Sequence, residues 1–304
     1  ELRDAEEKRK VFRENFYKTR SEIAQREGCK FLVQGTILAD IIETAGGVKT
    51  QHNVLSQIGI NPRQRYGFQI IEPLSSLLKW QVREVARHLK IPREISERQP
   101  FPGPGLSVRV VGEIKRDKLE ALKKATAITE ERLAEHRPDQ YFAVILDNAE
   151  EYDHPSLPVV REKVAQLLEV SASRVSIHLF EDKATGIKEG ERRYGEIVAV
   201  KAEGAEGLIL TPPILGLVML QNKITAENPS FTRIFYTVHE TKQRKPYVVA
   251  VRAVQTQDFL TAKVAEIPWA TLKETAQDII TACPNVSSVY YDVTPKPPAT
   301  IEME

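Results

Sequence analysis

The chain has 304 residues, of which 41% are apolar and 28% are charged, a composition typical of a soluble globular protein of about two domains. Its net charge of +1 gives no broad field that would attract nucleic acid, and its two cysteines are too few for a disulfide framework or a cysteine-based metal site. It has neither the run of about 20 apolar residues that a membrane span needs nor the apolar core of a signal peptide, so we expect a cytoplasmic protein with no membrane partner.

The first region, residues 1–112, predicts an α/β unit with a parallel sheet. Residues 1–27 predict a charged amphipathic helix, and residues 29–33 predict a short buried strand. Residues 68–72 predict a further strand, and residues 74–90 predict a helix with apolar residues at helical spacing. The apolar stripe of the first helix consists of Leu2, Ala5, Phe12, Phe16 and Ile23.

A polar turn follows the first predicted strand. Gln34, Gly35 and Thr36 come directly after its last residue. Parallel α/β sheets bind ligands at the carboxyl ends of their strands, so this turn is a candidate ligand site. An ordinary connection between a strand and a helix would have the same sequence character, and the residues alone leave both interpretations open.

Residues 100–106 form a loop with the sequence Pro-Phe-Pro-Gly-Pro-Gly-Leu. The prolines hold this PFPGPGL loop extended, while Gly103 and Gly105 allow backbone N–H groups to approach a ligand closely. A rigid linker between domains is the alternative. Both interpretations can hold, because ligand clefts form where domains meet.

Residues 113–304 predict a second region of α+β type. Within it, residues 192–202 align without gaps on residues 243–253, each a basic cluster followed by an apolar strand. This echo indicates two repeats, residues 113–203 and 204–304, although basic residues at a sheet edge also discourage aggregation. The predicted helices cover residues 118–136, 159–168 and 272–283, and the predicted strands cover residues 141–146, 175–180 and 286–293.

The tail, residues 296–304, reads Lys-Pro-Pro-Ala-Thr-Ile-Glu-Met-Glu. Its prolines stiffen the chain. The ammonium of Lys296 suits a phosphate, and the carboxylate of Glu302 suits ring N–H donors, so the tail has the charges that a nucleotide would need. Because the tail leaves a strongly apolar strand, we expect it to be tied down rather than solvated.

Two of these motifs carry a family resemblance. The tail, KPPATIEME, resembles the C-terminal KPPATIEWE signature of GMP synthetases, and PFPGPGL matches a second signature of that family without a mismatch. The chain resembles the C-terminal half of the family's ATP-pyrophosphatase domain (residues 1–112) followed by its dimerisation domain (residues 113–304). The resemblance implies an α/β fold, in which a partial adenine-nucleotide α-hydrolase-like parallel sheet precedes an α+β domain with a duplicated unit.

The resemblance also implies a function. It implies a ligase of GMP biosynthesis, in which ATP and Mg²⁺ adenylate the C2 oxygen of xanthosine monophosphate (XMP) and ammonia then displaces AMP. The ammonia would come from a glutaminase domain or subunit, and the protein would be a homodimer or a monomer with a duplicated dimerisation unit. The family's SGGVDS phosphate loop and its glutaminase are absent from these residues, so we expect the chain to be inactive alone. A tRNA-thiolating relative and a non-catalytic XMP-binding or dimerisation module are the alternatives.

The family's functional residues carry over by position. Lys49, in VKTQHNV, would stabilise the charge of the adenylation transition state, and Asp40 would be a candidate metal or ribose ligand. Gln34, Gly35 and Thr36 would line the ATP side. The XMP side would consist of Arg9, Pro102, Gly103, Gly105, Glu191, Arg193, Gln243, Lys296, Ile301 and Glu302.

Overall fold

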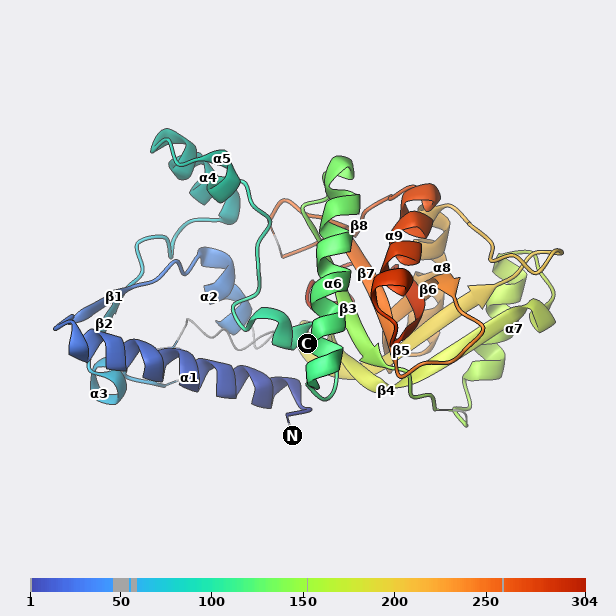
Figure 1. The fold of residues 1–304 in the computed structure, drawn as a ribbon, viewed down its shortest axis with the longest axis horizontal. Coiled ribbons are helices and arrows are strands. Elements are labelled where there is room, and N and C mark those ends of the chain that lie inside the picture. Colours follow the sequence, from blue (N-terminus) through green and yellow to red (C-terminus); the bar gives the residue numbers. More distant parts are fainter. Residues whose placement is uncertain (1, 46–54, 56–58, 152, 259) are drawn as a thin grey trace.

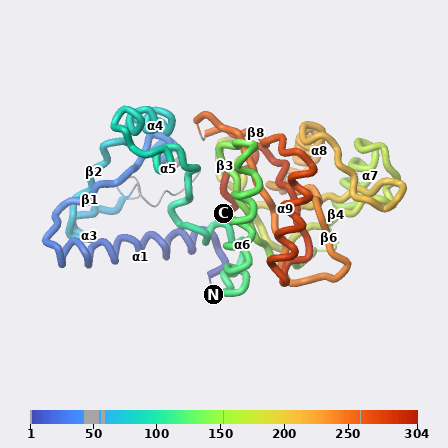
Figure 2. Tube along the Cα trace, turned by 45° about the horizontal axis from the view of Figure 1, so that its top comes forward, coloured from blue at the N-terminus to red at the C-terminus, as the bar shows by residue number. Residues whose placement is uncertain are grey.

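The computed structural model describes residues 2–45, 55, 59–151, 153–258 and 260–304. The described chain has two parts that lie side by side (Figure 1). One part holds a two-stranded sheet with helices α1 to α5, and the other holds a seven-stranded sheet with helices α6 to α9. The C-terminus lies between the two parts in both views (Figures 1 and 2).

Helix α1, Ala5–Arg26, confirms the predicted N-terminal helix. Its predicted apolar stripe is only partly right, because Ile23 is 45% exposed while the cations Lys8 and Arg9 are buried. The beginning of the helix therefore carries positive charge into the junction between the two parts. Farther along, Tyr17 is fully buried in the small core of the first part.

The first sheet is parallel, as predicted, and pairs β1 (Phe31–Val33) with β2 (Gln69–Ile71). The prediction that the first strand is buried is wrong, since Phe31 and Val33 are 56% and 65% exposed. Both side chains point to the same face of the strand, and the described residues leave that face exposed. The short helices of this part are α2 (Leu38–Ala45), α3 (Pro62–Tyr66) and α5 (Arg93–Ser96).

Helix α4 is shorter than predicted. It spans Lys79–His88 rather than residues 74–90. The side chain of Gln81 accepts the backbone N–H of Leu78 at 2.8 Å, which satisfies a donor that a helix start leaves unpaired. This local hydrogen bond fixes the beginning of the helix, and the apolar residues before it form turns.

The second part is built on a sheet of order β3-β7-β9-β6-β5-β4, with the short β8 paired to β7. Together with the first part it gives the predicted α/β fold. The strands are β3 (Gln140–Asp147), β4 (Val175–Lys188), β5 (Glu191–Ala202), β6 (Phe231–Glu240), β7 (Tyr247–Gln255), β8 (Lys263–Val264) and β9 (Val286–Asp292). The helices are α6 (Arg116–Leu133), α7 (Leu157–Leu167), α8 (Ile214–Glu227) and α9 (Trp269–Ala282).

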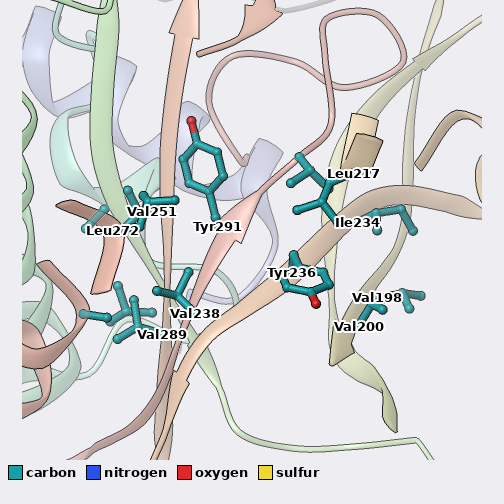
Figure 3. Packing of buried hydrophobic residues seen from close by; sticks show 14 of the residues in the cluster. Val198, Val200, Leu217, Ile234, Tyr236, Val238, Val251, Leu272, Val289 and Tyr291 are labelled. Carbon is teal, nitrogen blue, oxygen red and sulfur yellow. The ribbon is translucent and has the colours of Figure 1, made fainter. Parts of the chain in front are cut away.

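The two faces of this sheet are covered differently. Side chains alternate between the faces of a strand. One set, which includes Ile234 and Tyr236, packs against helices α6 to α9 in the main core (Figure 3). The opposite face forms a second apolar cluster, in which Phe235 lies with Ile301 and Met303 of the tail. The tail is thus part of the packing of the sheet.

The strand pairing has the same pattern in both halves of the sheet. The central strands β6 and β9 are antiparallel to each other. In one half β5 pairs parallel with β6 and β4 pairs antiparallel with β5, and in the other half β7 pairs parallel with β9 and β3 pairs antiparallel with β7. The strands that echo each other in sequence, β5 and β7, hold matching positions. A tight turn joins β4 to β5, whereas residues 148–246 separate β3 from β7 and contain the whole other half. Helix α8 and strand β6 are elements that the sequence analysis did not predict.

Candidate functional site

The tail is held along its length. Lys296 exchanges two backbone hydrogen bonds with Ala262, at 2.8 and 2.9 Å, and the carbonyl of Met303 accepts the N–H of Thr185 at 2.8 Å. The Lys296-Pro297 and Pro297-Pro298 peptide bonds are both cis. The prediction that the tail is tied down is confirmed, because its last five residues are buried.

Glu302 forms a buried ion pair with Arg109. The guanidinium donates from Nε and Nη2 to the two carboxylate oxygens, each at 3.0 Å. Its central carbon lies 3.9 Å from the ring centroid of Phe142 and 5.0 Å from that of Phe101. Since Phe101 belongs to the PFPGPGL loop, this pair joins the loop to the tail. The two bonds occupy two of the roughly four acceptor positions of a carboxylate.

The PFPGPGL loop closes into a turn. The N–H of Gly105 donates to the carbonyl of Pro102 at 2.9 Å, and Gly105 has a φ of 68°, a left-handed conformation that favours glycine. The short 3₁₀ helix η2, Gly105–Val108, follows and lies against α1. Gly103 is exposed at the tip, so its backbone is accessible to a ligand.

The last residue of the tail forms a second buried ion pair. The ammonium of Lys8 donates to the Glu304 carboxylate at 2.6 Å and to the carbonyl of Val110 at 2.6 Å, and the N–H of Gly112 donates to Glu304 at 3.0 Å. Burial raises the pKa of Glu304 to about 7 in spite of the neighbouring ammonium. Burial likewise lowers the pKa of Lys8. This pair ties the beginning of α1 to the tail.

Two arginines lie close together beside this pair. Burial, followed by repulsion from the Arg192 guanidinium, lowers the pKa of Arg9, whose Nε has no hydrogen-bond partner among the described residues. Arg192, at the beginning of β5, forms an ion pair with Glu6 of α1 and donates to Tyr194 at 2.5 Å and Thr185 at 3.2 Å. Adjacent guanidiniums of this kind are suited to an anion with several oxygens.

The predicted residues of the two basic clusters lie at opposite ends of the strands of the large sheet. Arg193 is next to Glu191, with an ion pair of 3.8 Å between exposed side chains, and pairs with Gly186, which in turn bridges to Ala299 of the tail. Gln243 follows β6 at the other end, where β9 begins. The ten residues of β6 span about 30 Å. Within one chain, Gln243 therefore lies far from the tail residues with which it was expected to share the XMP site.

The residues predicted for the ATP side lie at the carboxyl end of β1. The side-chain oxygen of Gln34 accepts the hydroxyl of Tyr17 at 2.7 Å, and the hydroxyl of Thr36 donates to Glu72 at 2.6 Å. A Cβ placed on Gly35 would meet no atom of the described residues within 4 Å, so these residues leave space beside the turn. The turn thus has room for a ligand group against its backbone.

Asp40 makes a local contact, and Lys49 lies outside the described residues. The Asp40 carboxylate accepts the backbone N–H of Ile37 at 3.1 Å, which supports the beginning of α2. Among the residues that the structure describes, no group of three His, Cys, Asp or Glu side chains could hold a metal ion.

Several buried cations of this junction escaped the sequence analysis. They are Lys8, Arg109, Arg233 and Arg252, with the half-buried Arg192 beside them. One signal was present, because Arg233 and Arg252 each interrupt a run of strand-forming residues (TRIFY and VVAVRAV). A charge at such a position is seldom buried without a partner, and the partners lie far away in the sequence.

The fold and these side chains define an α/β protein whose junction gathers cations of the kind that bind nucleotide phosphates. The family model described as "GMP synthase C terminal domain" matches residues 236–303. The chain is 42% identical, over its whole length and 75% of the relative's, to a subunit of the glutamine-hydrolyzing GMP synthase of Sulfurisphaera tokodaii. It is 43% identical to the subunit of the same name from Saccharolobus solfataricus (99% of this chain, 74% of the relative) and 35% identical to that of Methanopyrus kandleri (99% and 69%).

The chain belongs to the family of these glutamine-hydrolyzing GMP synthase subunits. The resemblance inferred from the tail and the PFPGPGL loop is confirmed, and GMP synthesis is the function of this family.

Proposed function

We propose that this protein carries out the amination step of GMP synthesis, in which XMP is adenylated by ATP and then attacked by ammonia. The observation that carries the proposal is the buried, anchored tail, which brings Glu302 and Glu304 to the junction where the cations of α1 lie and holds Lys296 at its beginning. An adenylated oxygen is a good leaving group, so the protein's task is to hold two nucleotides in line and to stabilise phosphate charge.

The acceptor nucleotide would bind at the junction of the two parts. Arg9 and Lys296 would hold the phosphate of XMP, which suits the Nε of Arg9 that lacks a partner among the described residues. The backbone of Pro102, Gly103 and Gly105 would approach the nucleotide from the PFPGPGL loop. This assignment is supported by the lowered pKa of Arg9, which burial and a second guanidinium produce and which an anion would offset.

The base would be read from the tail and the β4–β5 hairpin. Glu302 has acceptor positions left after its pair with Arg109, so a ring N–H can bind there without breaking that pair. Ile301 would support the base through its backbone. Glu191 and Arg193, exposed at the hairpin end, would contact the outer side of the nucleotide. Gln243 is left out of this assignment, because it lies at the other end of the strands.

ATP would bind at the turn after β1. Gln34, Gly35 and Thr36 would line the adenine-nucleotide side, which is supported by the space that the described residues leave beside Gly35. Lys49 would stabilise the charge that develops on the phosphates during adenylation. Asp40 would orient a ribose hydroxyl or a magnesium-bound water, and magnesium would neutralise the leaving pyrophosphate when it is bound.

We further propose that ammonia comes from a separate glutaminase subunit, since the relatives are each named as one subunit of a glutamine-hydrolyzing enzyme.

No helix in the described ranges is long and apolar enough to cross a membrane. The matching halves of the large sheet support a duplicated unit, but one in which a copy within residues 148–246 is inserted into the other, in place of the sequential repeats 113–203 and 204–304 expected from the sequence. Such a unit would provide within one chain the contact that single-copy members make between subunits.

The proposal is tested by AMP release. The natural full-length protein, supplied with ATP, Mg²⁺ and ammonium chloride, should release AMP only when XMP is present and should form GMP in equal amount. Inosine monophosphate (IMP), which has no C2 oxygen, serves as the control acceptor. AMP release without XMP, or with IMP as readily as with XMP, would contradict the proposed reaction.

A further inference from the structure

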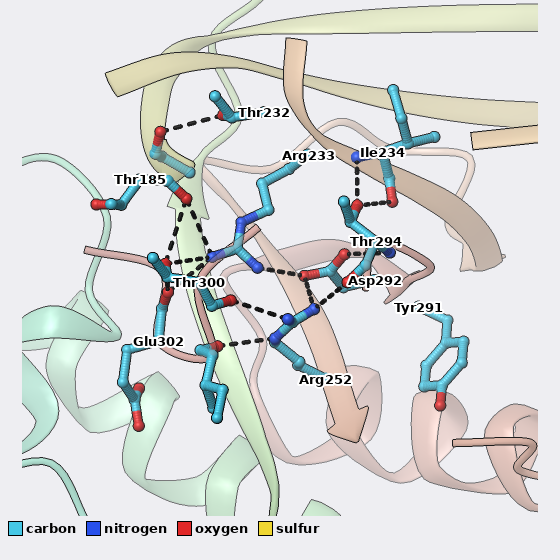
Figure 4. Close-up of polar contacts among 12 residues, drawn as sticks. Thr185, Thr232, Arg233, Ile234, Arg252, Tyr291, Asp292, Thr294, Thr300 and Glu302 are labelled. Carbon is cyan, nitrogen blue, oxygen red and sulfur yellow. Dashed lines mark hydrogen bonds and ion pairs between the residues drawn. The ribbon is translucent and has the colours of Figure 1, made fainter. Parts of the chain in front are cut away.

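Two fully buried arginines share one buried carboxylate below the tail (Figure 4). Arg233 of β6 and Arg252 of β7 donate to the same Oδ2 atom of Asp292, at 3.1 and 2.7 Å. Asp292 ends β9, the strand that lies between β6 and β7. All three side chains are 0% exposed, so water cannot satisfy the donors that remain.

Other donors of the two guanidiniums bind three consecutive carbonyls of the tail. Arg252 donates from Nη2 to the carbonyl of Thr300 at 2.8 Å and from Nε to that of Ile301 at 2.7 Å. Arg233 donates to the carbonyl of Glu302 at 2.7 Å and to the hydroxyl of Thr300 at 2.9 Å. The residues on which the acceptor site depends are thus fixed through their backbone.

The same cluster also holds the chain just before the tail. Arg252 donates to the carbonyl of Thr294 at 2.9 Å, and Asp292 accepts the N–H of Thr294 at 3.0 Å. The anchored positions, 294 and 300–302, therefore lie on both sides of Lys296. Any change in the cluster would move both ends of the segment that presents this ammonium.

Stability alone does not explain such a cluster. Two guanidiniums and one carboxylate leave a net positive charge in the interior, and burying ion pairs is often no better for stability than apolar packing of similar volume. Burial, followed by repulsion from Arg252, lowers the pKa of Arg233 to about 9. What the planar guanidiniums provide, and apolar side chains cannot, is several N–H donors in a fixed geometry.

We propose that Arg233, Arg252 and Asp292 are positioning residues of the acceptor-nucleotide site, which act through the tail and do not touch the nucleotide. The inference rests on the proposed function, because it assigns the cluster to the site that would bind XMP. It extends that function by naming the interior residues that set the place of Lys296 and Glu302.

The test is the substitution Arg252→Lys in the natural full-length protein. Lysine keeps the positive charge beside Asp292 but cannot reproduce the planar set of bonds to Thr294, Thr300 and Ile301. A displacement of about 1 Å in a group that positions the substrate can lower catalytic efficiency on the order of 100-fold. We expect KM for XMP to rise by about 10- to 100-fold with KM for ATP unchanged, as measured by XMP-dependent AMP release with ammonium chloride.

A matched control is available on β9, the strand that ends at Asp292. Tyr291 precedes Asp292, is fully buried and donates to the carbonyl of Ala265 at 2.6 Å, with its side chain turned away from the cluster (Figure 4). Tyr291→Phe removes a buried hydrogen bond but no tail contact. We expect it to lower the melting temperature and to leave both KM values unchanged.

The outcomes separate this inference from the proposed function. An active protein in which Arg252→Lys leaves KM for XMP unchanged, or raises both KM values together, would overturn the positioning role alone. If Arg252→Lys does not fold, Arg233→Lys decides by the same criteria, because Arg233 holds only one tail carbonyl. A wild-type protein that releases no AMP with XMP would refute the proposed function and the inference with it.

Discussion

The ion pair between Arg109 and Glu302 offers a quantitative test of how the tail is held. Its side chains are 1% and 8% exposed, so solvent screens the charges little. Removing one partner of such a pair leaves an unpaired buried charge and typically costs about 3–5 kcal/mol. We therefore expect Arg109→Met to lower the free energy of unfolding by about 3–5 kcal/mol.

The assay is urea denaturation followed by far-ultraviolet circular dichroism, with the double variant Arg109→Met/Glu302→Met beside the single one. Because the double variant removes both charges of the Arg109–Glu302 pair and leaves neither unpaired, it should be more stable than Arg109→Met alone. Arg132→Met is the control, since Arg132 and Asp278 form an ion pair of 2.6 Å between side chains that are 41% and 39% exposed. Solvent screens such exposed pairs, so they contribute little to stability.

The outcome that would refute this reasoning is specific. If Arg109→Met lowered the free energy of unfolding no more than Arg132→Met does, the Arg109–Glu302 pair would not be the buried, tail-holding contact described above. A double variant less stable than Arg109→Met would also contradict it, because the unpaired Glu302 carboxylate would then not be the source of the lost stability.

Three further predictions concern the ends of the site. The pKa of Glu304 is raised to about 7, above an unfolded value of about 4.3, so its stabilising contribution is present below the unfolded pKa and is lost as the pH rises through 7. Glu304→Gln should remove that loss, as measured by melting temperatures between pH 4 and 8, and an unchanged pH profile would contradict it. Lys296→Met should raise KM for XMP far more than Lys263→Met, a change of a neighbouring exposed lysine, and equal effects would remove Lys296 from the site. Gln243→Ala should leave KM for XMP unchanged, whereas a large rise would show that Gln243 reaches an acceptor site after all.

The sequence predicted the parts of the site that are local in the chain. The tail and the PFPGPGL loop were identified from their prolines, glycines and charges and from the family signatures that they resemble, and the structure confirms that the tail is tied down. Proline and glycine act on the backbone where they stand, so their effects can be predicted without knowing the fold. The α/β fold and most strands followed from hydrophobic periodicity in the same way.

What the sequence could not predict depends on contacts between distant residues. Arg109 and Glu302 are 193 residues apart, and Arg233 and Asp292 are 59 apart. From the sequence, a buried arginine cannot be distinguished from an exposed one until the carboxylate that pairs with it is known. The exposure of Phe31 was likewise missed, because burial of a strand depends on its neighbours in the sheet and not on its own residues.

Gln243 illustrates the limit of carrying a role over by motif. Its basic cluster echoes that of Arg192 and Arg193, and the two strands that follow them hold matching positions in the sheet. The two halves run in opposite directions, however, because β6 and β9 at their junction are antiparallel. Matching positions in the two halves therefore lie at opposite ends of the strands. The similarity that suggested a shared role is thus the reason why the two clusters are far apart.

The central claim is that the anchored tail builds an acceptor site for XMP, and calorimetric titration of the natural full-length protein with XMP tests it most directly. We predict saturable XMP binding that IMP does not reproduce and that Lys296→Met weakens strongly. Binding of XMP that is indifferent to Lys296→Met, or equal binding of XMP and IMP, would contradict the claim that the tail holds the phosphate and reads the base.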